Sequence, residues 1–100
     1  MAKHVYLTRV AQHDLDNVSL YLFENWGLTV LENFLALYEA KIQVISEFPE
    51  RYPLINHSYQ IRKAVLTKHN IILYRDKGSH VEVISIFDTR QDPGKVNRLL

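Results

Sequence analysis

The 100-residue sequence predicts a two-layer α+β domain in which an N-terminal helical hairpin packs on one face of a small, mainly antiparallel sheet. Three observations lead to this fold class. Apolar residues recur at helical spacing between residues 9 and 48, interrupted by one glycine. Three runs of strand-forming residues follow between residues 59 and 87, and a short strand-like run precedes the helices. The predicted order of elements is therefore β-α-α-β-β-β.

The first strand and the first helix are predicted within residues 4–26. Residues 4–8 alternate weakly and are rich in strand formers, and Thr8 is suited to cap the helix that follows. Gly27 can adopt the positive φ angle that commonly ends a helix. The apolar residues at helical spacing between these two positions are Ala11, Leu15, Val18, Leu22 and Trp26.

A second, longer helix is predicted to begin with a capping box of Thr29 and Glu32 and to stop at Phe48-Pro49. Because so short a connection joins the two helices, they must form an antiparallel hairpin. The apolar stripe of this helix is Leu31, Phe34, Leu35, Tyr38, Ile42 and Ile45, widened by Val30, Leu37 and Val44. The aromatic residues expected in the core are Trp26, Phe34 and Tyr38.

Residues 49–58 are predicted to form a loop, and three strands are predicted at 59–66, 70–75 and 80–87. Short turns at residues 67–69 and 76–79 make these strands antiparallel neighbours. One layer of helices cannot cover both faces of the sheet. We therefore expect the second face to stay open, to carry the cations of the second half of the chain, and to act as a binding surface.

Length and composition exclude several classes of protein. One hundred residues allow a single domain spanning 1–100, and 47% apolar with 23% charged residues is typical of a globular chain. The absence of cysteine excludes disulfides and thiolate sites, and the five histidines form no ligand-like cluster. We expect no metal, no cofactor, no membrane association and, from the lack of a signal-peptide pattern, a cytoplasmic location.

The net charge of +1 hides an asymmetry between the two halves of the chain. Residues 1–50 carry three basic and seven acidic side chains, which gives −4. Residues 51–100 carry nine basic and four acidic side chains, which gives +5. The basic half suggests an anionic partner, and the alternative is a solvated surface with salt bridges between the halves.

Several short motifs occur in a fixed order along these elements. The helices contain Ala11-x-x-Asp14-Leu15, Tyr21-Leu22 and Trp26-Gly27, and the strands contain Ile61-Arg62-Lys63, Ile71-Ile72-x-Tyr74-Arg75 and Ile84-x-Ile86-Phe87-Asp88-Thr89-Arg90-Gln91-Asp92-Pro93. Together, over nearly the whole chain, they resemble the RelE/ParE superfamily of toxins from bacterial toxin–antitoxin modules. The resemblance is strongest to the ParE-like branch found in plasmid stabilisation systems.

This resemblance implies a RelE/ParE-like fold and a small growth-inhibiting toxin that a cognate antitoxin silences. The ParE branch poisons DNA gyrase, and the RelE branch cleaves messenger RNA in the ribosomal A site. The partners implied are therefore an antitoxin and either gyrase or the ribosome, within a toxin–antitoxin hetero-oligomer or a homodimer. The antitoxin is expected to fold on binding and to lay apolar and acidic residues over the sheet and the helical hairpin.

The two branches differ in the chemistry that they require. Cleavage of RNA by its own 2′-hydroxyl needs a cation for the developing phosphate charge and groups that carry protons. The candidates for such roles are Arg62, His69 and Arg90. Ribonuclease members of the superfamily tend to carry a tyrosine or histidine in the C-terminal tail, and residues 91–100 have neither. We therefore expect a non-enzymatic toxin acting on gyrase, with a ribosome-dependent endoribonuclease and an inactive binding module as alternatives.

The residues singled out for contact with the antitoxin or the target are cationic or aromatic side chains of the second half. For the charged ones, each binding role has a plain structural alternative, such as pairing of Arg62 with an acidic neighbour or a local salt bridge from Arg90 to Asp88. The candidate binding residues are Arg62, Lys63, Lys68, Tyr74 and Arg90.

Overall fold

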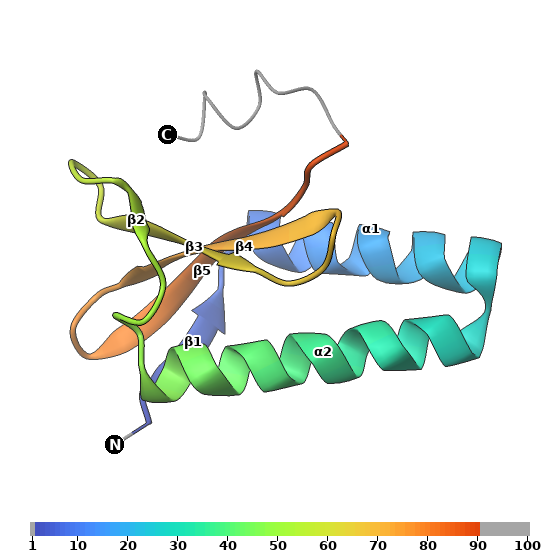
Figure 1. Ribbon diagram of the computed structural model, residues 1–100, viewed down its shortest axis with the longest axis horizontal. Helices are drawn as coiled ribbons and strands as arrows, with labels where there is room; N and C mark the ends of the chain where they lie inside the picture. Colours follow the sequence, from blue (N-terminus) through green and yellow to red (C-terminus); the bar gives the residue numbers. More distant parts are fainter. Residues whose placement is uncertain (1, 91–100) are drawn as a thin grey trace.

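The computed structural model describes residues 2–90, which form one five-stranded sheet and two helices. The strand order is β1-β5-β4-β3-β2, with β1 parallel to β5 and the other neighbours antiparallel. Figure 1 shows the helices as an antiparallel pair beside the sheet, which confirms the predicted two-layer α+β class. The elements are β1 (His4–Leu7), α1 (Arg9–Trp26), α2 (Leu28–Glu47), β2 (Leu54–Asn56), β3 (Ile61–Val65), β4 (Asn70–Asp76) and β5 (His80–Asp88).

The sheet has one strand more than the sequence predicted. β2 lies within residues 49–58, which were expected to be a loop, and it pairs with β3 through an irregular register at the edge of the sheet. Three residues are too few to display an alternating pattern, so only the pairing with β3 defines this strand. None of the helices in the described part of the chain is long and apolar enough to cross a membrane.

The beginnings of the two helices differ from each other. At α1, Thr8 accepts a hydrogen bond from the Ala11 amide (3.1 Å), as predicted, and its hydroxyl donates to the Ile84 carbonyl of β5 (2.8 Å). At α2, the predicted capping box is wrong, because the N-cap is Gly27 and the helix already begins at Leu28. Gly27, with φ +89°, turns the chain between the helices, so the first turn of α2 has no side-chain cap.

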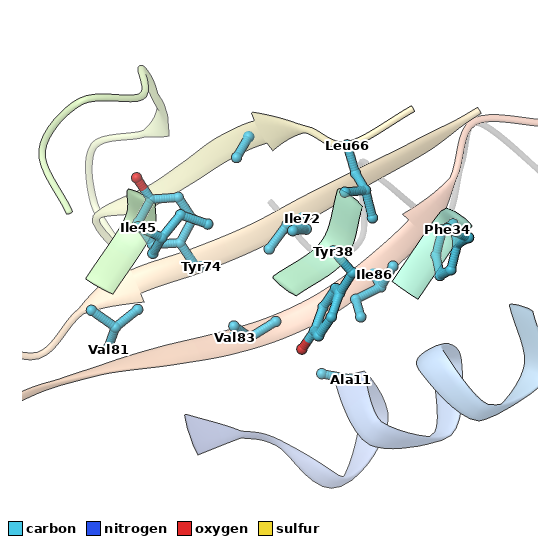
Figure 2. Packing of buried hydrophobic residues seen from close by; sticks show 11 residues of the cluster. Ala11, Phe34, Tyr38, Ile45, Leu66, Ile72, Tyr74, Val81, Val83 and Ile86 are labelled. Carbon is cyan, nitrogen blue, oxygen red and sulfur yellow. The ribbon is translucent and has the colours of Figure 1, made fainter. Parts of the chain in front are cut away.

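The core lies between the helices and the face of the sheet that they cover (Figure 2). Phe34, Tyr38 and Ile45 of α2 are buried there, which confirms the stripe predicted for this helix. Trp26 was expected in the core and is instead 66% exposed, because it is the last residue of α1, where the chain turns into α2. The remaining members of the buried cluster are Ala11, Ala64, Leu66, Ile72, Tyr74, Val81, Val83 and Ile86.

Arg62 lies on the helix-covered side of the sheet, so the expectation that it faces an open surface is wrong. It is opposite Tyr74 in the β3–β4 register and lies two residues from Ala64, on the same face of β3, and both of these are core residues. Its Nη1 atom donates to the carbonyls of Tyr52 (2.7 Å) and Glu50 (3.3 Å). The guanidinium therefore holds the segment between α2 and β2 against the sheet.

The opposite face of the sheet also differs from the open, cationic surface that was expected. Ile61, Leu73 and Phe87 alternate with core residues and therefore point away from the helices, yet they are only 4%, 1% and 5% exposed. Lys63 is opposite Leu73 on this face, and Arg75 is paired there with Glu82 (3.3 Å). The centre of this face is apolar and closed to solvent.

Replacing Phe34 by alanine tests the core assignment. Because Phe34 is 5% exposed, Phe34→Ala should lower the free energy of unfolding by about 3–5 kcal/mol. The control is Leu37→Ala, one turn further along α2, where the side chain is 53% exposed and a loss below about 1 kcal/mol is expected. Urea unfolding measures both, and equal losses would contradict the assignment.

Arg62→Met tests the structural role of the guanidinium. The substitution keeps the aliphatic stem and leaves the Tyr52 and Glu50 carbonyls without this donor, so unfolding should become easier by about 1–3 kcal/mol. Lys63→Met changes the next residue, on the opposite face, and should alter stability by roughly 0.5 kcal/mol or less. Thermal unfolding distinguishes the two variants, and an unchanged Arg62→Met chain would exclude the proposed role of the guanidinium.

Candidate functional site

An apolar cavity of about 490 Å³ lies between the tip of the helical hairpin and the β3–β4 turn. Trp26, Val30 and Leu37 line it and are 66%, 39% and 53% exposed, so these large side chains face solvent instead of packing in the core. The other residues that line it are Tyr21, Leu22, Asn33, Phe34, Thr67, His69, Asn70 and Arg90.

A second, more polar cavity of about 440 Å³ adjoins the first. Both cavities are lined by Tyr21, Leu22, Asn70 and Arg90, so they form one continuous depression with an apolar end and a polar end. This depression is called the hairpin groove below. The residues found only at its polar end are Asp14, Asn17, Val18, Ile86 and Asp88.

Asp14 at the polar end joins α1 to β5. Its Oδ2 atom accepts hydrogen bonds from the Ser85 hydroxyl (2.8 Å) and from the main-chain amide of Ile86 (3.0 Å). The carboxylate thus satisfies a strand-edge amide of β5 beyond the last residue that pairs with β1. These bonds fix the wall of the groove and account for the position of Asp14 in the sequence.

Arg90 lies where the two ends of the groove meet. Its Nε and Nη2 atoms donate to the two carboxylate oxygens of Asp88 (3.1 and 2.9 Å), and the guanidinium lies 5.8 Å from the centre of the Tyr21 ring. The hydrogen bonds from Arg90 hold the pKa of the Asp88 carboxyl below its usual value, and the same bonds raise the pKa of Arg90. The cation is therefore held in one place beside a compensating charge.

The β3–β4 turn brings three further polar residues to the apolar end. The His69 amide donates to the Thr67 hydroxyl (3.2 Å), and the His69 carbonyl accepts from the Thr89 amide (2.8 Å), which ties the turn to the end of β5. The Thr67 hydroxyl donates to Oδ1 of Asn70 (2.8 Å). As a result, His69 and Arg90, which lie 21 residues apart in the sequence, line the same cavity.

The candidate residues from the sequence divide into two groups. Arg90 and His69 lie in the hairpin groove, and Lys68 is exposed on the same turn as His69. Arg62 and Lys63 lie elsewhere, on opposite faces of the sheet. Tyr74 is fully buried and its hydroxyl donates to the Pro49 carbonyl (2.7 Å), so no surface of this side chain is available to a partner.

Burial is also the main reason that the pKa of Tyr74 rises to about 12. The phenol therefore keeps its proton at neutral pH and acts as a structural hydrogen-bond donor. Among residues 2–90, no group of three or more histidines and carboxylates is arranged to hold a metal ion.

Sequence reasoning missed the apolar residues of the groove. One feature of the sequence indicated them: the apolar stripe of α2 is wider than a helix needs to cover one face of a sheet. Val30 and Leu37 make up this extra width. A stripe of this width predicts a helix buried on more than one side, which is wrong for Val30 and Leu37, because both are exposed along the groove. Asn70 was not singled out, since nothing in the sequence distinguishes a buried asparagine at the start of a strand from an exposed one.

The fold of this chain is similar to the folds of several solved bacterial proteins. Chromosomal ParDE from Pseudomonas aeruginosa has a TM-score of 0.74 at 14% identity, with 89% of this chain and 98% of that chain covered. The RelBE2 toxin–antitoxin complex from Mycobacterium tuberculosis has a TM-score of 0.58 at 21% identity, covering 88% and 99%. A conserved hypothetical protein from Helicobacter pylori has a TM-score of 0.54 at 17% identity, covering 88% and 94%.

At these identities the three solved structures establish the shared fold, and no curated protein sequence matches significantly. The family comes from the sequence profile of the ParE toxin of the type II toxin–antitoxin system, parDE, which matches residues 5–93. That range covers nearly the whole chain, including both helices, β2 to β5 and all of β1 except His4. The chain therefore belongs to the ParE toxin family of type II toxin–antitoxin systems.

Proposed function

We propose that a cognate antitoxin neutralises this ParE-family toxin by binding in the hairpin groove. The observation that carries the proposal is the exposure of Trp26, Leu37 and Tyr21 (66%, 53% and 47%) along one continuous groove. Large apolar side chains gathered at a concave surface are typical of protein-binding sites. The solved ParDE and RelBE2 relatives, which are described as a toxin–antitoxin system and complex, support a partner of this kind.

The groove favours a partner with apolar side chains. Each Å² of apolar surface removed from water stabilises a complex by about 25 cal/mol before the cost of ordering the partner is subtracted. A partly disordered antitoxin segment that folds on binding can follow such a groove along its length. The resulting assembly is a toxin–antitoxin hetero-oligomer.

The target that we propose is DNA gyrase, reached in the cytoplasm. Family membership supports a ParE-type toxin, and acting on gyrase requires only a binding surface. Arg90, the cation of the groove, is already neutralised by Asp88, which suits a recognition surface better than the stabilisation of a phosphate transition state.

A second candidate is a ribosome-dependent messenger RNA endoribonuclease. One observation favours it: His69 and Arg90 line the same cavity, and together they offer a proton carrier and a cation. In this case the groove itself would receive the RNA.

Substitution of Trp26 tests the binding surface. Trp26→Ala should weaken binding to the antitoxin encoded beside this chain at least tenfold, because the most exposed apolar residue of the groove is lost. Phe23→Ala is the matched control, since Phe23 is 51% exposed on the same helix and does not line the groove. Isothermal titration calorimetry gives both affinities, and equal losses would argue against the groove.

Purified gyrase and ribosomes distinguish the two candidate targets. We expect the chain to inhibit plasmid supercoiling by gyrase, and the antitoxin to restore it. Messenger RNA translated in the presence of the chain should show no new ends. New ends that disappear with His69→Ala, together with normal supercoiling, would reject gyrase and establish the endoribonuclease.

A further inference from the structure

Within residues 2–90, the side-chain amide of Asn70 has no hydrogen-bond acceptor. The residue is 6% exposed, and its Oδ1 atom accepts from the Thr67 hydroxyl at 2.8 Å. The Nδ2 atom is buried and has no hydrogen-bond partner within residues 2–90. A buried amide donor without an acceptor is unfavourable and rare in folded proteins, so it calls for an explanation.

The position of Asn70 in the groove supplies that explanation. Asn70 lines both ends of the hairpin groove, at the point where the apolar end meets the polar end. The last torsion of an asparagine side chain is soft, and the Thr67 hydroxyl can rotate with the amide. A small rotation therefore turns Nδ2 from the floor into the groove, where an acceptor from a bound molecule can meet it.

The chemistry of the site restricts the acceptor. Arg90, the cation that lines the groove together with Asn70, is already paired with Asp88, so the surroundings do not select an anion. A neutral amide donor is suited to a neutral carbonyl oxygen. Main-chain carbonyls inside an α-helix are used by the helix itself, whereas those of an extended segment are free.

We propose that Asn70 donates its side-chain amide to a main-chain carbonyl of the antitoxin, and that the antitoxin segment is extended where it crosses the β3–β4 turn. Apolar side chains of the segment lie against Trp26, Val30 and Leu37, and its backbone is held by Asn70. This inference rests on the proposed function, because it concerns the partner that binds in the same groove. Asn70 is thus a specificity-determining residue that fixes the register of the bound segment.

The test replaces the donor by an apolar side chain of similar size. Titration of wild-type and Asn70→Leu chains with the full-length antitoxin encoded beside this chain should give at least tenfold weaker binding for the variant. Its melting temperature should stay close to that of the wild type, because the substitution removes an unpaired buried donor along with the bond to Thr67. Asn25→Leu makes the same change at an exposed asparagine of α1 that does not line the groove, and it should alter the affinity less than threefold.

A second measurement does not depend on a variant. In the ¹⁵N-labelled wild-type chain, the Asn70 side-chain amide protons should shift downfield and exchange more slowly once the antitoxin is bound. Wild-type-like affinity of Asn70→Leu, or unchanged Asn70 amide resonances in the complex, would overturn the role of Asn70 and leave the proposed function standing. Failure of the wild-type chain to bind the antitoxin would overturn both.

Discussion

The hydrogen bonds between the helical hairpin and the sheet gather near the start of α1 and the end of α2, and the candidate site lies towards the other end of the hairpin. At the end of α2, the Ser46 carbonyl accepts a hydrogen bond from the Lys3 amide (2.9 Å). At the start of α1, the Thr8 hydroxyl donates to the Ile84 carbonyl of β5. Asp14, in the second turn of α1, adds hydrogen bonds to Ser85 and Ile86 of β5. Further along α1, the Tyr21 ring centre lies 5.8 Å from the Arg90 guanidinium. The tip of the hairpin lies away from the sheet (Figure 1), and Trp26, the last residue of α1, is 66% exposed.

The groove at this tip combines two features that are unfavourable without a partner, namely exposed apolar side chains and a buried amide without an acceptor in residues 2–90. Its apolar end exposes side chains that would be more stable in a core, and its floor contains the unpaired amide of Asn70. Each feature costs free energy in the isolated chain. A bound segment that covers the apolar side chains and accepts a hydrogen bond from Asn70 removes both costs. A protein that exists with a partner can therefore retain both features.

The cations of the second half illustrate why charge asymmetry alone did not locate the site. Arg62 binds the carbonyls of Tyr52 and Glu50, Arg75 pairs with Glu82, and Arg90 pairs with Asp88. These guanidinium groups are used within the chain, and two of them are paired by carboxylates of the same half. Within residues 2–90, the arginines of the second half therefore do not gather into a free basic face on the sheet.

The spacing of apolar residues in the sequence determined the two helices, the three main strands and their order along the chain. This was possible because helical or strand periodicity and the cap at Thr8 depend on residues only a few positions apart. The core positions of Phe34 and Tyr38 followed in the same way. The face to which Arg62 points could not be determined, since both faces of β3 carry apolar residues and only pairing with β4 and the packing of the helices decide which is covered. The groove could not be predicted from the sequence for the same reason. His69, Asn70 and Arg90 become neighbours of Trp26 only when a turn, a strand end and a helix tip converge, and such long-range packing leaves no periodic signal in the chain.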